Sequence, residues 1–169
     1  EKLGRYEAMC RKVNCLHFED FERTREKVEV CLEFIRQRGG KRVLCHMDAA
    51  NVNYLVLTDG SIRLLDWEYG GMCHPLGDVA MFGVFSNYAQ PEMDRLLALY
   101  LQREPEREER MLYYSYTASA GLLWSLWAQY RQYYGENFGE YALNQYRIAK
   151  TYNKLVRQLL EEEQAAQGR

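Results

Sequence analysis

Two short runs typical of β-strands, residues 54–57 and 62–65, constrain the fold of this chain more than any other feature. They are joined by Thr58-Asp-Gly-Ser61. An Asp-Gly pair between two such runs is a strong signal for a β-hairpin. Most of the remaining chain has helical rather than alternating periodicity. The sequence therefore predicts an α+β fold that is predominantly α-helical, with one small β-hairpin in its N-terminal half.

Apolar residues recur at spacings of three and four along most of the chain, which predicts amphipathic helices. We expect Asp78 to cap one helix through its side-chain oxygen and Gly135 to end the longest one. The last helix is expected to fray from residue 161 onward. The predicted helices cover residues 18–38, 78–88, 91–101, a long aromatic segment that ends at 134, and the C-terminal segment, with a short strand at 42–45.

Composition narrows the class of protein. A length of 169 residues suits one domain, 1–169. The net charge of -2 argues against a general nucleic-acid binder, and no apolar run is long enough to predict a membrane span. Five cysteines without a C-x-x-C pair argue against a disulfide framework or a zinc site, so we expect buried reduced thiols and a cytoplasmic location. Because the chain starts at Glu1 rather than Met, we expect a processed chain or an excised domain.

The chemistry is concentrated in the segment around the hairpin. The chain carries H-x-D-x-x-x-x-N from His46 through Asp48 to Asn53, and Asp66 follows the hairpin. Phosphoryl transfer needs a carboxylate near the attacking hydroxyl and oxygen ligands that hold Mg²⁺ on the nucleotide phosphates. The hairpin would return Asp66 to the loop that carries Asp48 and Asn53. This order of elements indicates the catalytic loop of a kinase-type phosphotransferase.

Two longer motifs carry a family resemblance. They are L-C-H-M-D-A-A-N-V-N at residues 44–53 and L-L-D-W-E-Y-G-G-M-C-H-P-L-G-D-V-A at 64–80. With L-W-S-L-W at 123–127 and F-G-E-Y at 138–141, the sequence resembles the choline/ethanolamine kinases of the aminoglycoside-phosphotransferase-like superfamily. The resemblance extends over about residues 40–155 and implies the C-terminal lobe of a protein-kinase-like fold.

The resemblance implies a role for each residue in these motifs. Asp48 looks like the catalytic base, and Asn53 and Asp66 look like Mg²⁺ ligands. Asp78 looks like a structural residue that braces the catalytic loop, and His46 is more simply a bracing residue than an acid or base. Two positions depart from the family pattern. Met47 replaces a small or polar residue and is expected to point away from the site, and Phe85 replaces a substrate-contacting Glu of choline kinases.

The substrate side is predicted from aromatic residues. Trp124 and Trp127 share a helix face, and they pack in the core or form a cage for a quaternary ammonium group. Tyr69 and Tyr141 are candidate further walls. A cage of rings without the family's Glu favours choline over ethanolamine.

The leading hypothesis is an ATP- and Mg²⁺-dependent kinase for choline or a related small amino alcohol. The alternatives are an aminoglycoside or sugar phosphotransferase and a non-catalytic kinase-like binding module. The chain has neither a Gly-rich phosphate loop with G-x-G-x-x-G spacing nor a V-A-I-K-like strand, which belong to the N-terminal lobe. We therefore expect the 169 residues alone to turn over ATP poorly. The implied partners are ATP and a small-molecule acceptor, in phosphocholine or phospholipid metabolism.

Overall fold

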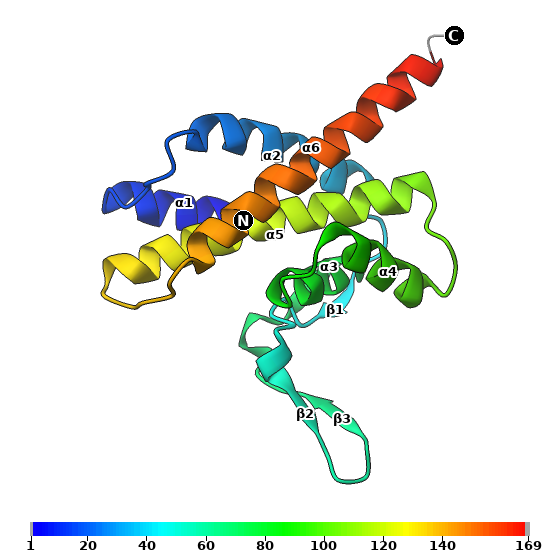
Figure 1. Cartoon of the computed structure of the whole chain (residues 1–169), viewed down its shortest axis with the longest axis horizontal. Coiled ribbons are helices and arrows are strands. Elements are labelled where there is room, and N and C mark those ends of the chain that lie inside the picture. The colour runs from blue at the N-terminus through cyan, green and yellow to red at the C-terminus, as the bar shows by residue number, and fades with distance from the viewer. Residues whose placement is uncertain (1, 168–169) are drawn as a thin grey trace.

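A computed structural model describes residues 2–167 of the chain. It is built mainly of helices, with two small antiparallel sheets (Figure 1). The predicted fold class is therefore confirmed. The helices are α1 (Lys2–Lys12), α2 (Phe21–Arg38), α3 (Leu76–Phe85), α4 (Gln90–Leu101), α5 (Arg107–Tyr133) and α6 (Tyr141–Gln167). The strands are β1 (Val43–Cys45), β2 (Tyr54–Val56), β3 (Ile62–Leu64) and β4 (Gly71–Cys73), and short 3₁₀ turns cover Asn51–Asn53 and Trp67–Tyr69.

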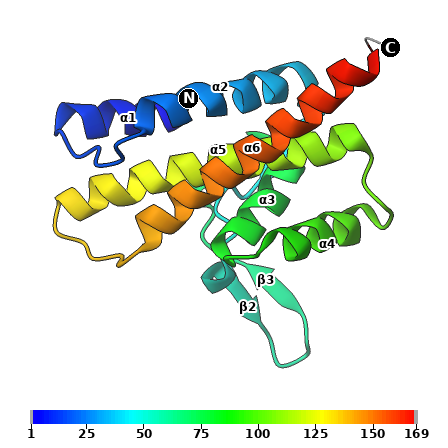
Figure 2. The ribbon, with the colours of Figure 1, turned by 45° about the horizontal axis from the view of Figure 1, so that its top comes forward.

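The long helices α5 and α6 form the centre of the fold. They run side by side, with α1 and α2 on one side of the pair and α3 and α4 on another (Figures 1 and 2). Nearly every residue of α5 from Met111 to Gln129 is buried or half-buried, because this helix is covered on several faces. Gly121 lets the two backbones approach closely: a Cβ at this position would lie 2.7 Å from the carbonyl oxygen of Gln145 and 2.8 Å from the amide nitrogen of Ala149.

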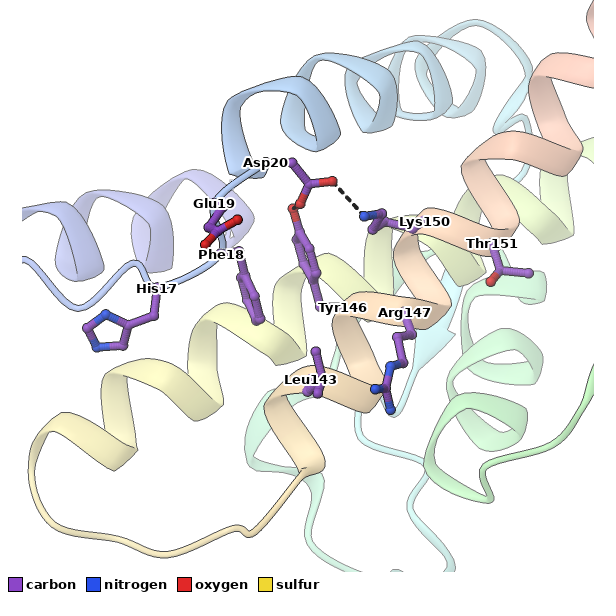
Figure 3. A pocket seen from close by; sticks show the side chains of 9 residues that line it. All are labelled: His17, Phe18, Glu19, Asp20, Leu143, Tyr146, Arg147, Lys150 and Thr151. Carbon is purple, nitrogen blue, oxygen red and sulfur yellow. Dashed lines mark hydrogen bonds and ion pairs between the residues drawn. The ribbon is translucent and has the colours of Figure 1, made fainter.

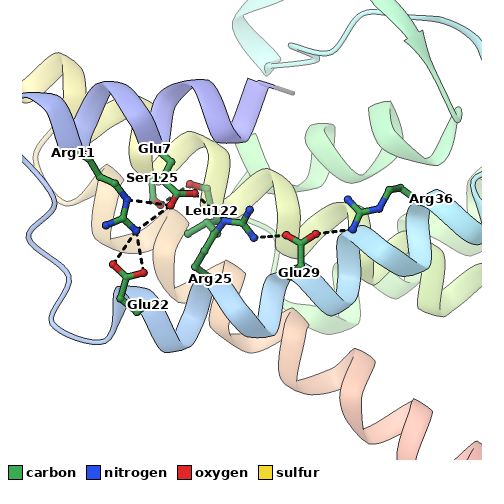
Figure 4. A network of polar contacts seen from close by, with 8 residues as sticks. All are labelled: Glu7, Arg11, Glu22, Arg25, Glu29, Arg36, Leu122 and Ser125. Atoms are coloured by element: carbon green, nitrogen blue, oxygen red, sulfur yellow. Dashed lines mark hydrogen bonds and ion pairs between the residues drawn. The ribbon is translucent and has the colours of Figure 1, made fainter.

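A ladder of ion pairs joins α1 to α2 on the outer surface (Figure 4). Arg11 binds both Glu7 and Glu22, at 3.0 and 2.8 Å. Arg25 binds Glu7 at 2.9 Å and continues the ladder along α2 through Glu29. Single exposed pairs contribute little, but a connected network of this kind holds the two helices in one relative orientation. This matters for the site, because α1 begins close to it.

The predicted hairpin is confirmed, and the structure adds a second sheet. Strands β2 and β3 pair with Tyr54 opposite Leu64 and Val56 opposite Ile62, and the hairpin projects from the helical body (Figure 1). Strand β1 pairs with β4, with Val43 opposite Cys73. The sequence predicted no strand between the hairpin and the helix that follows it. That was incomplete, because Gly71–Cys73 becomes a strand through pairing with residues far back in the chain.

Two helix expectations need correction, and one helix was not expected. Asp78 does not cap its helix: α3 begins at Leu76, and the carboxylate of Asp78, two residues inside it, is bonded elsewhere. The last helix does not fray at residue 161 but continues to Gln167; residues 168 and 169 lie outside the described part. The first helix, α1, was not predicted, because its apolar side is short and interrupted by charges.

Among the described residues, 2–167, none of the helices combines the length and the apolar character that crossing a bilayer requires.

The close approach at Gly121 leads to a stability prediction. Gly121→Ala should lower the free energy of unfolding by roughly 1–3 kcal/mol, because the new methyl group meets backbone atoms that cannot move aside. Gly4→Ala in α1 is the matched control: nothing lies within 4 Å of its Cβ position, so alanine should be neutral or stabilise by up to about 1 kcal/mol. Urea denaturation of both variants measures the difference. Equal stabilities would show that α5 and α6 separate easily at this point.

Candidate functional site

The carboxylate of Asp78 anchors the loop that follows β1. One oxygen accepts the backbone N–H of His46 at 2.6 Å, and the other accepts that of Met47 at 2.8 Å. Hydrogen bonds to a carboxylate are stronger than those between neutral groups, and these two consecutive amides would otherwise be unpaired and half-buried. Asp78 thus connects the loop to α3, which packs on α5.

His46 connects the same loop to the end of the hairpin. Its side chain is fully buried, and its Nε2–H donates to the carbonyl oxygen of Leu65 at 2.6 Å. This bond fixes which ring nitrogen carries the proton, because a carbonyl can only accept. The ring of Trp67 lies edge-on to the imidazole at 4.8 Å. His46 is therefore held by one hydrogen bond and one ring contact, while its Nδ1 is buried without a hydrogen-bond partner among the described residues.

Asp48 and Asn53 face each other across the loop. The side-chain nitrogen of Asn53 donates to the backbone oxygen of Asp48 at 2.9 Å and to its carboxylate Oδ2 at 3.2 Å. The amide oxygen of Asn53 and the second carboxylate oxygen of Asp48 have no hydrogen-bond partner among residues 2–167. Burial raises the pKa of the Asp48 carboxyl above its ordinary value; the Asn53 bond opposes this, and the nearby charge of Asp66 adds to it.

Asp66 follows the hairpin and lies near Asp48. The backbone N–H of Leu65 donates to the carbonyl of Asn53 at 2.8 Å, which ties the end of β3 to the catalytic loop. Asp66 itself has a left-handed backbone, with φ of 61°, a conformation that Asp tolerates better than most residues. Its carboxylate is exposed and makes no hydrogen bond or ion pair within the described residues.

Aromatic rings form a connected cluster beside this loop. Trp124 lies at its centre, buried, with the ring centroids of Phe85, Trp127 and Tyr69 at 5.1, 5.5 and 6.0 Å. All three contacts are edge-to-face or nearly so. Trp127 also contacts Phe138 at 5.1 Å, and the guanidinium of Arg131 lies over its ring at 5.9 Å. The Nε1–H of Trp124 is buried without a partner in the described structure.

Tyr69 and Tyr141 connect the aromatic cluster to the catalytic loop. Burial raises the pKa of both phenols, and the negative charge of Asp48 adds to the rise in each case. Met47, the residue before Asp48, packs in the same cluster as Trp124 and Tyr141. The structure thus brings together the sequence-predicted residues Asp48, Asn53 and Asp66 on one side and the predicted aromatic residues on the other.

Met47 differs from expectation. The sequence analysis expected its side chain to point away from the site, but it packs against the aromatic cluster and lines a small cavity with Tyr69 and Trp124. Its backbone is left-handed, with φ of 64°, which favours the Gly or Asn that the family usually has here. Methionine in this conformation is strained, and its side chain fills space that a smaller residue would leave open.

A larger surface hollow exists elsewhere, between the α1–α2 connection and α6 (Figure 3). It has a volume of about 710 Å³ and contains none of the predicted site residues. Its polar groups bind one another: Tyr146 donates to Asp20 at 2.9 Å, and Lys150 pairs with Asp20 at 2.5 Å. The stacked rings of Phe18 and Tyr146 form its floor. The residues around Asp48 are therefore chosen as the candidate site for their reactive groups, although a hollow of larger volume lies elsewhere.

Comparison with known proteins decides the family. Residues 3–113 match the model of the phosphotransferase enzyme family, and this segment contains the loop with Asp48 and Asn53, the hairpin and α3. The chain belongs to this phosphotransferase family. Over 105 residues it is 30% identical to protein LicA of Haemophilus influenzae; the match covers 59% of this chain and 39% of LicA.

Solved structures extend the likeness to the fold. The choline kinase LicA from Streptococcus pneumoniae superposes with a TM-score of 0.75 at 26% identity, over 90% of this chain and 53% of that one. A choline/ethanolamine kinase family protein from Mesorhizobium loti gives the same TM-score at 21% identity, over 90% and 54%. The chain is thus a choline kinase-like member of the family with the helical C-terminal lobe of a kinase-like fold, as predicted. It spans about half the length of these relatives.

Sequence reasoning missed two contributors to this region. Phe138 extends the ring cluster through Trp127, and its place in F-G-E-Y at 138–141 was a signal for it. Lys2 lies against Tyr69, and no sequence pattern indicates this contact because 67 residues separate the two.

The raised pKa of Asp48 predicts a pH-dependent stability difference. In the folded chain the proton is held more tightly than in the unfolded chain, so ionised Asp48 destabilises the fold above its ordinary pKa. Asp48→Asn removes this charge and keeps an oxygen that accepts from Asn53. At pH 7 it should raise the free energy of unfolding by less than about 1 kcal/mol, because water screens this partly exposed charge.

This gain should shrink as the pH falls toward 4, where the Asp48 carboxyl takes up its proton in the folded chain. Urea denaturation of the wild-type and Asp48→Asn chains between pH 4 and 8 measures it. A constant difference across this range would contradict the raised pKa.

Proposed function

We propose that this chain is the catalytic-loop lobe of an ATP- and Mg²⁺-dependent kinase that phosphorylates the hydroxyl group of choline or a related small amino alcohol. The observation that carries the proposal is that Met47, the residue before Asp48, packs in the aromatic cluster of Trp124 and Tyr141. A carboxylate beside rings is the arrangement that a cationic alcohol needs: the rings attract the cation, and the carboxylate receives the hydroxyl.

In this proposal Asp48 is the base. Its free carboxylate oxygen accepts the proton of the acceptor hydroxyl while the bond from Asn53 holds the other oxygen. A carboxyl pKa raised by burial makes the group a better proton acceptor than an exposed aspartate. Orientation of the hydroxyl contributes as much, because phosphoryl transfer depends mainly on positioning and electrostatics.

The oxygen donors of the site fit Mg²⁺. Asn53 offers an amide oxygen without a hydrogen-bond partner, and Asp66 offers an exposed carboxylate. Hard oxygen donors in small number suit Mg²⁺, which keeps several waters and binds the phosphates of its nucleotide. When bound, the ion would neutralise the charge of those phosphates. A structure of LicA in complex with AMP supports nucleotide use in this family.

The aromatic cluster around Trp124 indicates the chemical class of the acceptor. Trp124 is surrounded mainly by rings, those of Phe85, Trp127 and Tyr69, and the carboxylates near the cluster are those of Asp48 and Glu68 beside Tyr69. An aminoglycoside carries several ammonium groups and would favour several carboxylates. Phe85, at 5.1 Å from Trp124, replaces the acidic residue that would suit a primary ammonium. Choline, whose methyl groups fit against rings, is therefore the preferred acceptor.

The working enzyme needs a second lobe to cover the nucleotide. The match covers only 53% and 54% of the two solved relatives. The β1–β4 sheet and the hairpin expose large apolar side chains, including Leu44, Met72, Val56 and Ile62, each more than 60% exposed. Exposed apolar patches of this kind mark interaction surfaces. We infer that the nucleotide-covering lobe packs on this face, and that the 169 residues alone are inactive.

Substitution of Trp127 tests the acceptor assignment. In a form of the protein that also carries the nucleotide-covering lobe, Trp127→Ala should lower kcat/KM for choline by roughly 5- to 30-fold, as loss of a desolvated cation–π contact does. The effect on ethanolamine and on the KM for Mg-ATP should be small. Tyr133→Ala, an exposed aromatic near the end of the same helix, is the matched control and should change neither.

A core tryptophan predicts something different. In that case Trp127→Ala lowers stability by about 3–5 kcal/mol and leaves the choline-to-ethanolamine ratio unchanged. Thermal melts beside the kinetics separate the two, and an unchanged ratio would rule out the cage.

A further inference from the structure

The side chain of Lys2 lies against the aromatic part of the site. Its Nζ donates to the backbone oxygen of Tyr69 at 3.2 Å and lies 4.8 Å from the centre of the Tyr69 ring. The second distance is within the range of a cation–π interaction. Lys2 therefore already places an ammonium group on a ring that the acceptor's cation would use.

The position of Lys2 is not explained by its own helix. Lys2 is in the first turn of α1, where the helix dipole disfavours a positive charge, and this turn contains no acidic residue to offset it. Its one described hydrogen bond crosses to Tyr69, and it lies near enough to Asp48 for its charge to act on that carboxyl. The groups that stabilise the Lys2 ammonium are therefore Tyr69 and Asp48, which belong to the candidate site.

Two spaces adjoin Lys2: an open hollow of about 530 Å³, which Tyr69, Met47 and Gly71 also line, and a small enclosed cavity next to Trp124. Lys2, Tyr69, Met47 and Trp124 line an enclosed cavity of about 20 Å³. A cavity of this size holds about one water molecule. Lys2 is itself an exposed side chain, so it can swing outward into solvent at little cost. Movement of Lys2 is the simplest way to enlarge this cavity, because the other lining side chains are half-buried or buried.

We propose that Lys2 is a specificity-determining residue of the acceptor site: its ammonium occupies the cation position against Tyr69, and an organic cation binds by displacing it. This inference rests on the proposed function, because it assumes that the acceptor's cation binds the ring cluster. A cation then binds only if its gain in binding free energy exceeds the cost of displacing the Lys2 ammonium. A quaternary ammonium, which gains more from ring faces than from hydrogen bonds, displaces it better than a strongly hydrated primary ammonium.

A titration with tetramethylammonium chloride tests the inference. Tryptophan fluorescence of the 169-residue chain is followed at constant ionic strength for the wild type, Lys2→Met and Lys12→Met. Lys2→Met keeps the length of the side chain and removes the competing charge, so the apparent Kd should fall about 2- to 5-fold. Lys12→Met, an exposed lysine at the other end of the same helix, removes the same charge from the chain and should leave the Kd unchanged.

A second readout follows the lysine itself. The ε-methylene proton signals of Lys2 should be shifted upfield by the Tyr69 ring and should return toward the values of a free lysine as tetramethylammonium is added. Saturable quenching with an unchanged Kd in Lys2→Met, or with unmoved Lys2 signals, would overturn the role of Lys2 alone. The absence of saturable quenching in all three chains would instead overturn the cation site of the proposed function.

Discussion

The two hydrogen bonds of the Asp78 carboxylate hold this molecule's chemistry in place. They fix His46 and Met47, the two residues before Asp48, to a helix that packs on the central helix α5. Without them the loop would leave two amides unpaired, and each such loss costs about 1–3 kcal/mol. The hydrogen bond from His46 to Leu65 then fixes the end of the hairpin relative to this loop. The position of Asp66 therefore depends on Asp78, although the two carboxylates serve different purposes.

The site joins two environments that favour opposite kinds of group. Asp48, Asn53 and Asp66 offer oxygen atoms that remain available for a metal ion or a hydroxyl. Trp124 and its neighbours offer ring faces and edges, with few polar atoms. Burial raises the pKa of the Asp48 carboxyl above its ordinary value. A cationic alcohol has one end suited to each environment, which is why the arrangement favours such an acceptor.

Local signals in the sequence predicted the elements better than their contacts. The Asp-Gly pair at 59–60 and the spacing of apolar residues were sufficient for the hairpin and most helices, because both depend on neighbouring residues. The strand Gly71–Cys73 was missed, since only its pairing with Val43–Cys45 makes it a strand. The helical pattern placed Asp78 as a helix cap, whereas its carboxylate binds a loop 31 and 32 residues away, as the bracing role implied by the family resemblance requires. The contact of Lys2 with Tyr69 depends on how α1 packs and has no sequence signal.

The central claim is that Asp48 receives the proton of a cationic alcohol held by the rings. The most direct measurement compares wild type and Asp48→Asn in a form of the protein that also carries the nucleotide-covering lobe. Steady-state kinetics with choline and Mg-ATP give kcat, and fluorescence titration gives the Kd for choline. The account predicts that kcat falls by roughly 100-fold or more while the Kd changes less than about 3-fold. A near-normal kcat in Asp48→Asn would contradict it.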